Sequence, residues 1–164
     1  MDRPSVTIKE LTESDLPAGA DIIRRAFATV AAEFGLTKEN CPTNGAFIDA
    51  DRLLDEYRRG IKMFGLFGED RQLGFVALER KDEDTFFLEK LAVLPEFRHN
   101  RYGGMLMDCA KEYVAQAGGK NISIGIILEN QRLLQWYKTL EFVETGTKKF
   151  DHLPFTVCFL RLAV

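Results

Sequence analysis

Apolar positions along the chain recur with two periods, which predict helices and strands in alternation. Spacing of three and four residues from Leu16 to Phe34, and again from Tyr102 to Ala117, is typical of amphipathic helices with one buried face. Alternation of apolar and polar residues from Asn121 to Leu128 is typical of a strand with one buried face. The pattern therefore predicts helices packed on a sheet.

Capping and turn residues divide the pattern into an ordered series of elements. Gly35 and Gly118-Gly119 are helix stops, and Asn130 is a helix cap. The predicted order is a strand, two helices, three strands, a helix, a strand, a helix and two strands. This order favours an α/β chain of the α+β type. We expect a mostly antiparallel sheet of about seven strands with one β–α–β crossover. The strands are expected at 6–11, 62–67, 73–79, 85–94, 121–128, 142–149 and 155–162, and the helices at about 16–34, 47–59, 102–117 and just after Asn130.

Composition and charge narrow the class of protein. A chain of 164 residues that is 46% hydrophobic suits one domain over residues 1–164. A net charge of −3 argues against a nucleic-acid or anionic-membrane surface. No apolar run reaches the roughly 20 residues of a membrane helix, and the N-terminus lacks the apolar core of a signal peptide, so we expect a cytoplasmic protein. Two isolated histidines predict no metal site, and the three scattered cysteines are expected to be reduced thiols.

The segment 88–107, LEKLAVLPEFRHNRYGGMLM, predicts an anion-binding turn between a strand and a helix. A helix N-terminus has four backbone N–H groups without intrahelical partners and the positive end of the helix dipole, which together suit phosphate oxygens. Two common phosphate motifs are excluded, because the chain has no G-x-G-x-x-G pattern and its only Gly-Lys pair, Gly119-Lys120, is followed by Asn121.

This segment resembles motif A of the GNAT acyltransferase superfamily. In that motif a strand with an apolar-x-Val-x-Pro-Glu run leads to [QR]-x-x-G-x-[GA] and a helix, and here residues 91–97 are followed by Arg98-His99-Asn100-Arg101-Tyr102-Gly103. Arg101 stands where the family has its first glycine. Its side chain either crowds an approaching pyrophosphate or adds a guanidinium contact to it, and both outcomes stay open.

A second segment resembles motif B of the same superfamily. Asn130 is followed seven residues later by Tyr137, and Leu140-Glu141-Phe142 stands in place of Leu-Gly-Phe. Seven residues make about two helical turns, so Asn130 and Tyr137 are expected on one side of a short helix. The predicted element order is also that of the GNAT fold, so the resemblance covers essentially the whole chain.

The resemblance implies an acetyl-CoA-dependent N-acyltransferase, with acetyl-CoA as the acyl-donor cosubstrate. In the GNAT fold the strands before and after the motif A helix splay apart, and the pantetheine arm lies between them. The first strand then offers main-chain groups to the pantetheine amides, and the turn after it holds the pyrophosphate. The cofactor-binding residues implied are Leu91, Ala92, Val93, Arg98, His99, Asn100, Arg101, Tyr102, Gly103, Gly104 and Asn130.

Two residues are candidates for acid–base chemistry. Acyl transfer from a thioester expels a thiolate, which a phenol such as Tyr137 can protonate; the alternative is that Tyr137 is a core aromatic. Glu89 lies in an apolar run that raises a carboxylate pKa, so it can deprotonate an amine, as the glutamate does in polyamine acetyltransferases with a similar Leu-Glu pair. Alternatively, Glu89 pairs with a cross-strand cation or faces solvent as Lys90 does, and the base acts through a water.

The acceptor expected from the resemblance is a primary amine of a small molecule or peptide that attacks directly in a ternary complex. Six acidic residues between Glu33 and Glu56 hint at a cationic acceptor. A non-catalytic CoA-binding regulatory module remains as an alternative, because Arg101 and Glu141 replace family glycines. A nucleotide-binding protein that uses the same anion-binding turn remains as another. Pairing of the last strands across a homodimer also stays open.

Overall fold

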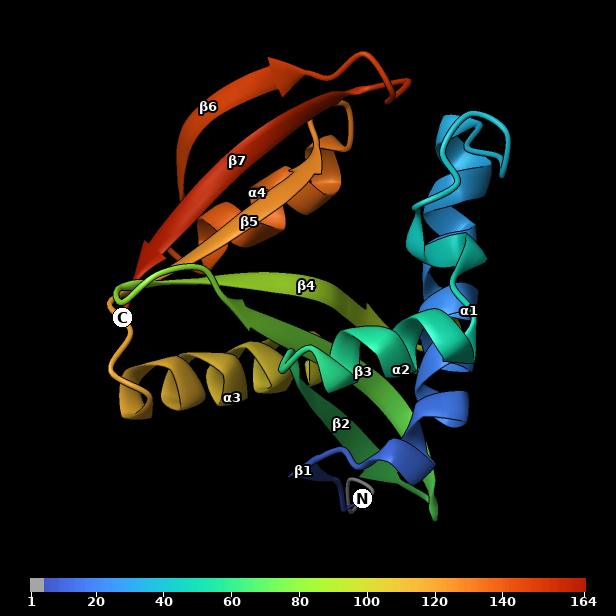
Figure 1. Cartoon of the computed structure of the whole chain (residues 1–164), viewed down its shortest axis with the longest axis vertical. Coiled ribbons are helices and arrows are strands. Elements are labelled where there is room, and N and C mark those ends of the chain that lie inside the picture. The colour runs from blue at the N-terminus through green and yellow to red at the C-terminus, as the bar shows by residue number, and fades with distance from the viewer. Residues whose placement is uncertain (1–4) are drawn as a thin grey trace.

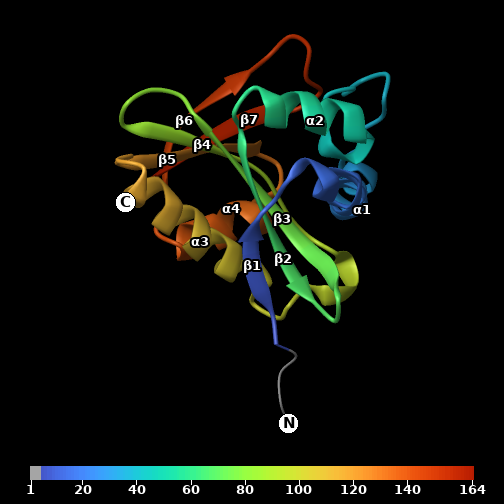
Figure 2. The ribbon, with the colours of Figure 1, turned by 60° about the horizontal axis from the view of Figure 1, so that its bottom comes forward.

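The computed structural model describes residues 5–164 as a seven-stranded sheet with helices on both faces (Figure 1). The strand order is β1-β2-β3-β4-β5-β7-β6, and only β4 and β5 pair in parallel. Helices α1 and α2 lie on one side of the sheet, and α3 and α4 lie on the other (Figure 2). This confirms the predicted mostly antiparallel sheet with one crossover. The bounds are β1 Thr7–Glu10, α1 Leu16–Phe34, α2 Ala50–Arg58, β2 Lys62–Gly68, β3 Arg71–Arg80, β4 Thr85–Val93, α3 Tyr102–Gln116, β5 Asn121–Ile127, α4 Gln131–Thr139, β6 Val143–Lys149 and β7 Thr156–Ala163.

Local capping explains where the predicted boundaries were wrong. The second helix begins at Ala50 rather than Phe47, because the Asp49 carboxylate accepts the Arg52 N–H at 2.8 Å and the preceding residue is extended. The hairpin between β2 and β3 turns on Glu69 and Asp70 alone, whose φ angles of 54° and 61° are those of a tight two-residue turn. Among residues 5–164, no helix has the length and apolarity needed to cross a membrane.

The central strands β4 and β5 part soon after they meet. Their backbones pair only at Thr85–Asn121, Phe86–Ile122 and Phe87–Ser123. Beyond Phe87, β4 bulges at Lys90, which has a φ of 54°, and its register with β3 slips by one residue. The splayed pair implied by the family resemblance is therefore confirmed. The two strands separate as β4 runs toward the turn before α3 and β5 runs toward the loop before α4 (Figure 1).

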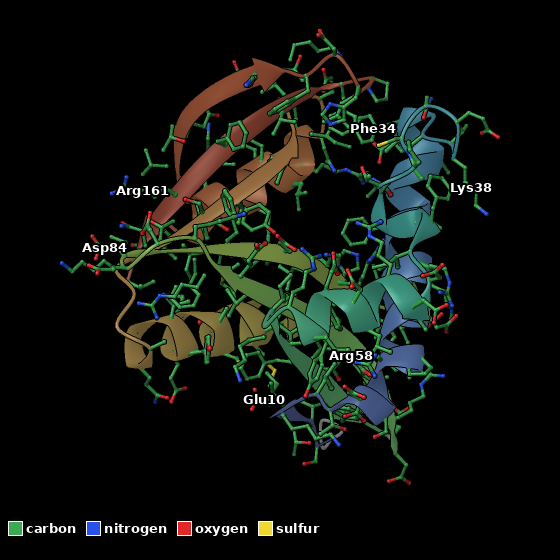
Figure 3. All side chains as sticks on the ribbon, in the orientation of Figure 1. Glu10, Phe34, Lys38, Arg58, Asp84 and Arg161 are labelled. Atoms are coloured by element: carbon green, nitrogen blue, oxygen red, sulfur yellow. The ribbon has the colours of Figure 1, made fainter. Side chains whose placement is uncertain are left out.

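Two apolar clusters hold the halves of the molecule together. The large cluster fills both faces of the sheet, with Phe75 and Leu106 fully buried near its centre. A small second cluster joins the loop after α1 to the end of β5 and the loop between β6 and β7, and Phe34 marks its place in Figure 3. This second cluster thus joins α1 and the loop after it to the end of β5, where β4 and β5 have separated. The buried members of this second cluster are Ala31, Leu36, Cys41 and Ile127.

The end of α4 carries a backbone strain that can be tested. Glu141 has a φ of 73°, and its N–H and that of Phe142 donate to the carbonyls of Lys138 and Tyr137, the bonding pattern that normally favours glycine. A left-handed conformation costs a residue with a Cβ about 1–2 kcal/mol, and glycine avoids this cost. Part of that advantage is offset, because glycine gives the unfolded chain more conformational freedom, which is lost on folding. We therefore expect Glu141→Gly to raise the free energy of unfolding by about 0.5–1 kcal/mol, measured by urea denaturation.

The matched control is Glu141→Ala, which removes the same carboxylate but keeps the Cβ. We expect it to leave stability unchanged or slightly lower. An equal gain in both variants would assign the effect to the lost charge and contradict the backbone explanation.

Candidate functional site

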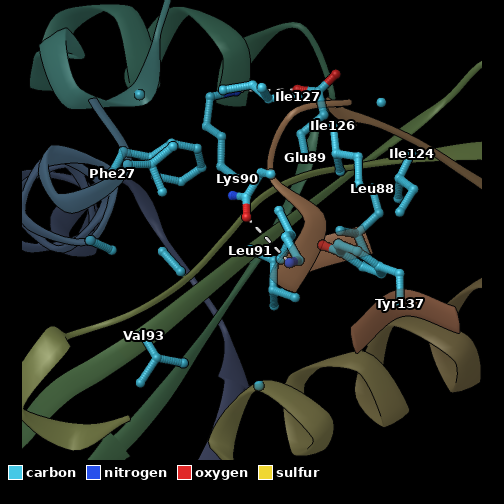
Figure 4. Close-up of a pocket in the computed structure, with 18 of the residues that line it drawn as sticks. Phe27, Leu88, Glu89, Lys90, Leu91, Val93, Ile124, Ile126, Ile127 and Tyr137 are labelled. Carbon is cyan, nitrogen blue, oxygen red and sulfur yellow. Dashed lines mark hydrogen bonds and ion pairs between the residues drawn. The ribbon is translucent and has the colours of Figure 1, made fainter. Parts of the chain in front are cut away.

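A cavity of about 1280 Å³ lies where β4 and β5 part. Its walls come from α1, α2, β4, the turn before α3, β5, α4 and β7 (Figure 4). Every residue that the sequence predicted for the site lines this cavity except Asn100. Those residues are Glu89, Leu91, Ala92, Val93, Arg98, His99, Arg101, Tyr102, Gly103, Gly104, Asn130 and Tyr137.

The turn before α3 is built as an anion cradle. The backbone N–H groups of residues 99–104 find no acceptor among residues 5–164. His99 and Arg101 both have left-handed φ angles, 68° and 66°, and such alternation turns successive N–H groups toward one concave side. A Cβ added to Gly104 would meet nothing within 4 Å, so the mouth of the cradle is open. The geometry of the cradle therefore suits phosphate oxygens, and Arg101 adopts the left-handed conformation for which the family uses glycine.

Two residues of this turn have their side chains engaged within the protein. The Arg98 guanidinium donates to the Ala26 carbonyl at 2.9 Å and to the Thr29 hydroxyl at 3.2 Å, both on α1. The Asn100 amide donates to the carbonyl of Phe97 at 2.9 Å. Arg98 thus ties the cradle to α1, and Asn100 braces the cradle from outside the cavity.

Tyr137 reaches the cavity from α4. Asn130 caps this helix by accepting the Leu133 N–H at 3.3 Å, and Tyr137 packs edge-on against Trp136 and Phe142. Figure 4 shows the Tyr137 ring extending from α4 toward Leu88 and β4. Only 5% of the residue is exposed, and this burial raises the pKa of Tyr137, so the phenol stays protonated at neutral pH.

The bulge in β4 places two consecutive charged side chains on one face of the sheet. The Lys90 ammonium lies 3.2 Å from the Glu89 carboxylate and 3.1 Å from the carboxylate of Glu56 on α2. The Lys90 side chain is only 11% exposed, so the expectation that it faces solvent was wrong. A regular strand would have sent Glu89 and Lys90 to opposite faces. Glu89 therefore pairs with its chain neighbour rather than with a cross-strand cation.

The environment of Glu89 favours a poised base. Burial raises the pKa of Glu89 most, Lys90 opposes that rise, and a hydrogen bond shared with Glu79 on β3 raises the pKa further. The same pairing and the nearby cations lower the pKa of Glu79, so of the two carboxyls Glu89 binds a proton more readily. The pKa of Glu89 is thus raised above its ordinary value, as its apolar neighbours predicted.

Sequence reasoning missed the buried charges Lys90 and Glu56. Glu56 had a usable signal, because it falls three residues after Leu53 on the buried stripe of α2. Lys90 had none, since a bulge inside a strand leaves no simple mark on an alternating pattern. The aromatic side chains that line the cavity from α1, β4 and β7 were also missed, because they belong to different elements and meet only in the fold.

Comparison with known families gives a match over most of the chain. The sequence model of the Acetyltransferase (GNAT) family matches residues 31–142, which include β4, the anion cradle and Tyr137. No curated protein sequence matches the chain significantly.

Several solved structures share the fold at low sequence identity. The ribosomal-protein-S18-alanine N-acetyltransferase of Escherichia coli superposes with a TM-score of 0.78 at 16% identity, covering 98% of this chain and 94% of that one. The PaiA N-acetyltransferase of Thermoplasma acidophilum, in complex with coenzyme A, gives 0.77 at 20% identity with 98% and 99% covered. A putative acetyltransferase of Salmonella typhimurium, with acetyl-CoA, gives 0.73 at 19% identity with 96% and 93% covered.

The coupling of the two carboxyls can be measured directly. In Glu79→Gln the carboxyl that raises the Glu89 pKa is replaced by an amide that can donate to the Glu89 carboxylate. We therefore expect the Glu89 pKa, followed by carboxyl carbon NMR, to fall in this variant. Glu83→Gln, an exposed change outside the cavity, is the matched control. A Glu89 titration that is the same in all three proteins would show that Glu79 is not coupled to Glu89.

Proposed function

We propose that this chain, which belongs to the GNAT acetyltransferase family, transfers an acetyl group from acetyl-CoA to a primary amine. One observation carries the proposal: a carboxyl with a raised pKa, a protonated phenol and an open cradle of backbone N–H groups border a single cavity. A base, an acid and an anion site are the groups that transfer from a phosphate-bearing thioester to an amine requires.

The residues present fit CoA. The open N–H groups of residues 99–104 suit its pyrophosphate, and the unpaired edge of β4 at 91–93 offers main-chain groups to its pantetheine amides. Acetyl-CoA supplies an activated acetyl thioester when bound. Solved relatives of the same fold contain acetyl-CoA or coenzyme A, which supports this assignment.

The acid–base roles follow from the protonation states of the two side chains. Glu89 accepts a proton from the acceptor ammonium, because its raised pKa lies closer to the working pH than that of an ordinary glutamate. The freed amine then attacks the acyl carbon directly in a ternary complex, so a C–N bond forms and the C–S bond of the thioester breaks. Tyr137 holds its phenolic proton at neutral pH and donates it to the departing sulfur, and the second proton lost by the attacking nitrogen restores the phenol.

A thermal shift assay tests the cradle. Acetyl-CoA and CoA at about 100 times their dissociation constants are expected to add roughly 2.7 kcal/mol of stability and to raise the midpoint by roughly 5–10 °C. ATP at the same concentration is expected to do little, because it has no pantetheine arm to pair with β4. A rise with ATP equal to that with CoA would identify a nucleotide site instead, and no rise with any of the three would remove the proposal.

Substitution of the phenol tests the acid. In Tyr137→Phe we expect turnover, measured as acceptor-dependent release of CoA thiol, to fall about 10²–10⁴-fold while the KM for acetyl-CoA changes little. Tyr113→Phe is the matched control, since Tyr113 packs on Phe64 and Phe86 away from the cavity. Unchanged turnover in Tyr137→Phe would remove Tyr137 from the chemistry, and thiol release that never depends on an acceptor would favour a binding module.

A further inference from the structure

We infer that the acceptor is a small primary amine on an aromatic or branched apolar body that carries no second cationic group. This rests on the proposed function and assigns the part of the cavity on the α1 and α2 side of the sheet. Helices α1 and α2 lie on that side of the sheet and α4 lies on the other (Figure 2), and residues of α1, β4, β5 and β7 line the cavity.

Apolar side chains line this part of the cavity from four directions. Four of them are phenylalanines, and each is only partly buried, so ring surface is left for a ligand. Covering an aromatic face with an apolar group removes water from both surfaces and favours binding. The residues are Phe27 and Val30 of α1, Phe87 of β4, Phe155 before β7, and Val157 and Phe159 of β7.

Gly125 lies beneath two side chains of the apolar wall. It lies on β5 directly opposite Phe159 of β7, and it lines the cavity. A Cβ built there would lie 3.2 Å from Val157 and 3.4 Å from Phe159, so these two side chains pack closely over the glycine. The φ angle of Gly125 is not left-handed, so the backbone does not require glycine. A larger residue at this position would therefore displace Val157 and Phe159 from their places in the wall.

The charged groups of this part of the cavity already neutralise one another. Glu56 and Glu89 share Lys90 at 3.1 and 3.2 Å, and Arg52 lies 3.9 Å from Glu56. Near the end of α1, Glu33 pairs with Arg132 at 3.1 Å. A second ammonium on the acceptor would need a carboxylate without a partner, and taking that ammonium out of water unpaired is costly.

The acidic residues that hinted at a cationic acceptor are used elsewhere. Asp49 caps α2, and Asp55 pairs with Arg59 at 3.3 Å, while Glu39 and Asp51 are exposed outside the cavity. The second carboxylate oxygen of Glu56 has no hydrogen-bond partner within residues 5–164, but it is closed off from the cavity. That oxygen can reach a ligand only if the side chain turns, so a diamine is the acceptor that competes with our inference.

The experiment compares three amines on the full chain at saturating acetyl-CoA. We expect kcat/KM for 2-phenylethylamine to exceed that for n-propylamine and that for 1,4-diaminobutane by at least about tenfold, because the phenyl ring occupies the apolar wall. A higher kcat/KM for the diamine, or for a peptide with a free N-terminus, would overturn the inference. An absence of acetyl transfer to every amine would instead contradict the proposed function.

Substitution of Gly125 tests where the aromatic ring of the acceptor binds. Gly125→Val displaces the Val157 and Phe159 side chains from the wall, so we expect the ratio of kcat/KM for phenylethylamine to that for propylamine to fall at least about tenfold, with a smaller fall in Gly125→Ala. Gly146→Val on the exposed strand β6 is the matched control and keeps the ratio. If Gly125→Val fails to fold, Phe159→Leu tests the same wall. A ratio that survives both Gly125→Ala and Phe159→Leu would show that the ring does not bind here.

Discussion

The site depends on one constraint, which is that β4 and β5 share backbone hydrogen bonds over only three residues. A parallel pair that continued would satisfy its main-chain groups internally and leave no cavity between the strands. The bulge at Lys90 bends β4 away from that pairing, and the buried contacts of Lys90 with Glu56 and Glu89 hold its left-handed backbone in place. The same residue thus opens the sheet and fixes the orientation of the candidate base.

Burial acts differently on the two candidate acid–base groups. It raises the Glu89 pKa toward neutrality, which makes that carboxyl a more effective proton acceptor. It raises the Tyr137 pKa away from neutrality, which keeps the phenol protonated and makes a tyrosinate costly. In the proposed reaction Tyr137 is therefore suited to give a proton to sulfur only while that proton is replaced at once, because a lasting tyrosinate is costly in this surrounding.

The sequence predicted those parts of the molecule that local patterns encode. The long helix beginning at Tyr102 was placed to within one residue, since its apolar stripe and flanking glycines agree. The cap at Asn130 was found because asparagine favours the position before an apolar helical stripe. Lys90 was misplaced, because strand alternation carries no information about a bulge that depends on contacts with α2. The surroundings of Gly125 were equally invisible, since its neighbours Val157 and Phe159 lie more than thirty positions away in the chain and their proximity is a property of the fold.

The hydrogen bonds from Arg98 to α1 link two places that the chain separates by about seventy residues. Arg98 belongs to the anion cradle, and its acceptors Ala26 and Thr29 flank Phe27 on the apolar wall. If the cradle binds phosphate as proposed, a shift of the cradle would move the part of α1 that carries Phe27. Thermodynamic linkage makes any such coupling reciprocal, so each ligand would change the affinity for the other by the same factor. A single guanidinium thus gives the two halves of the cavity a physical route to cooperativity.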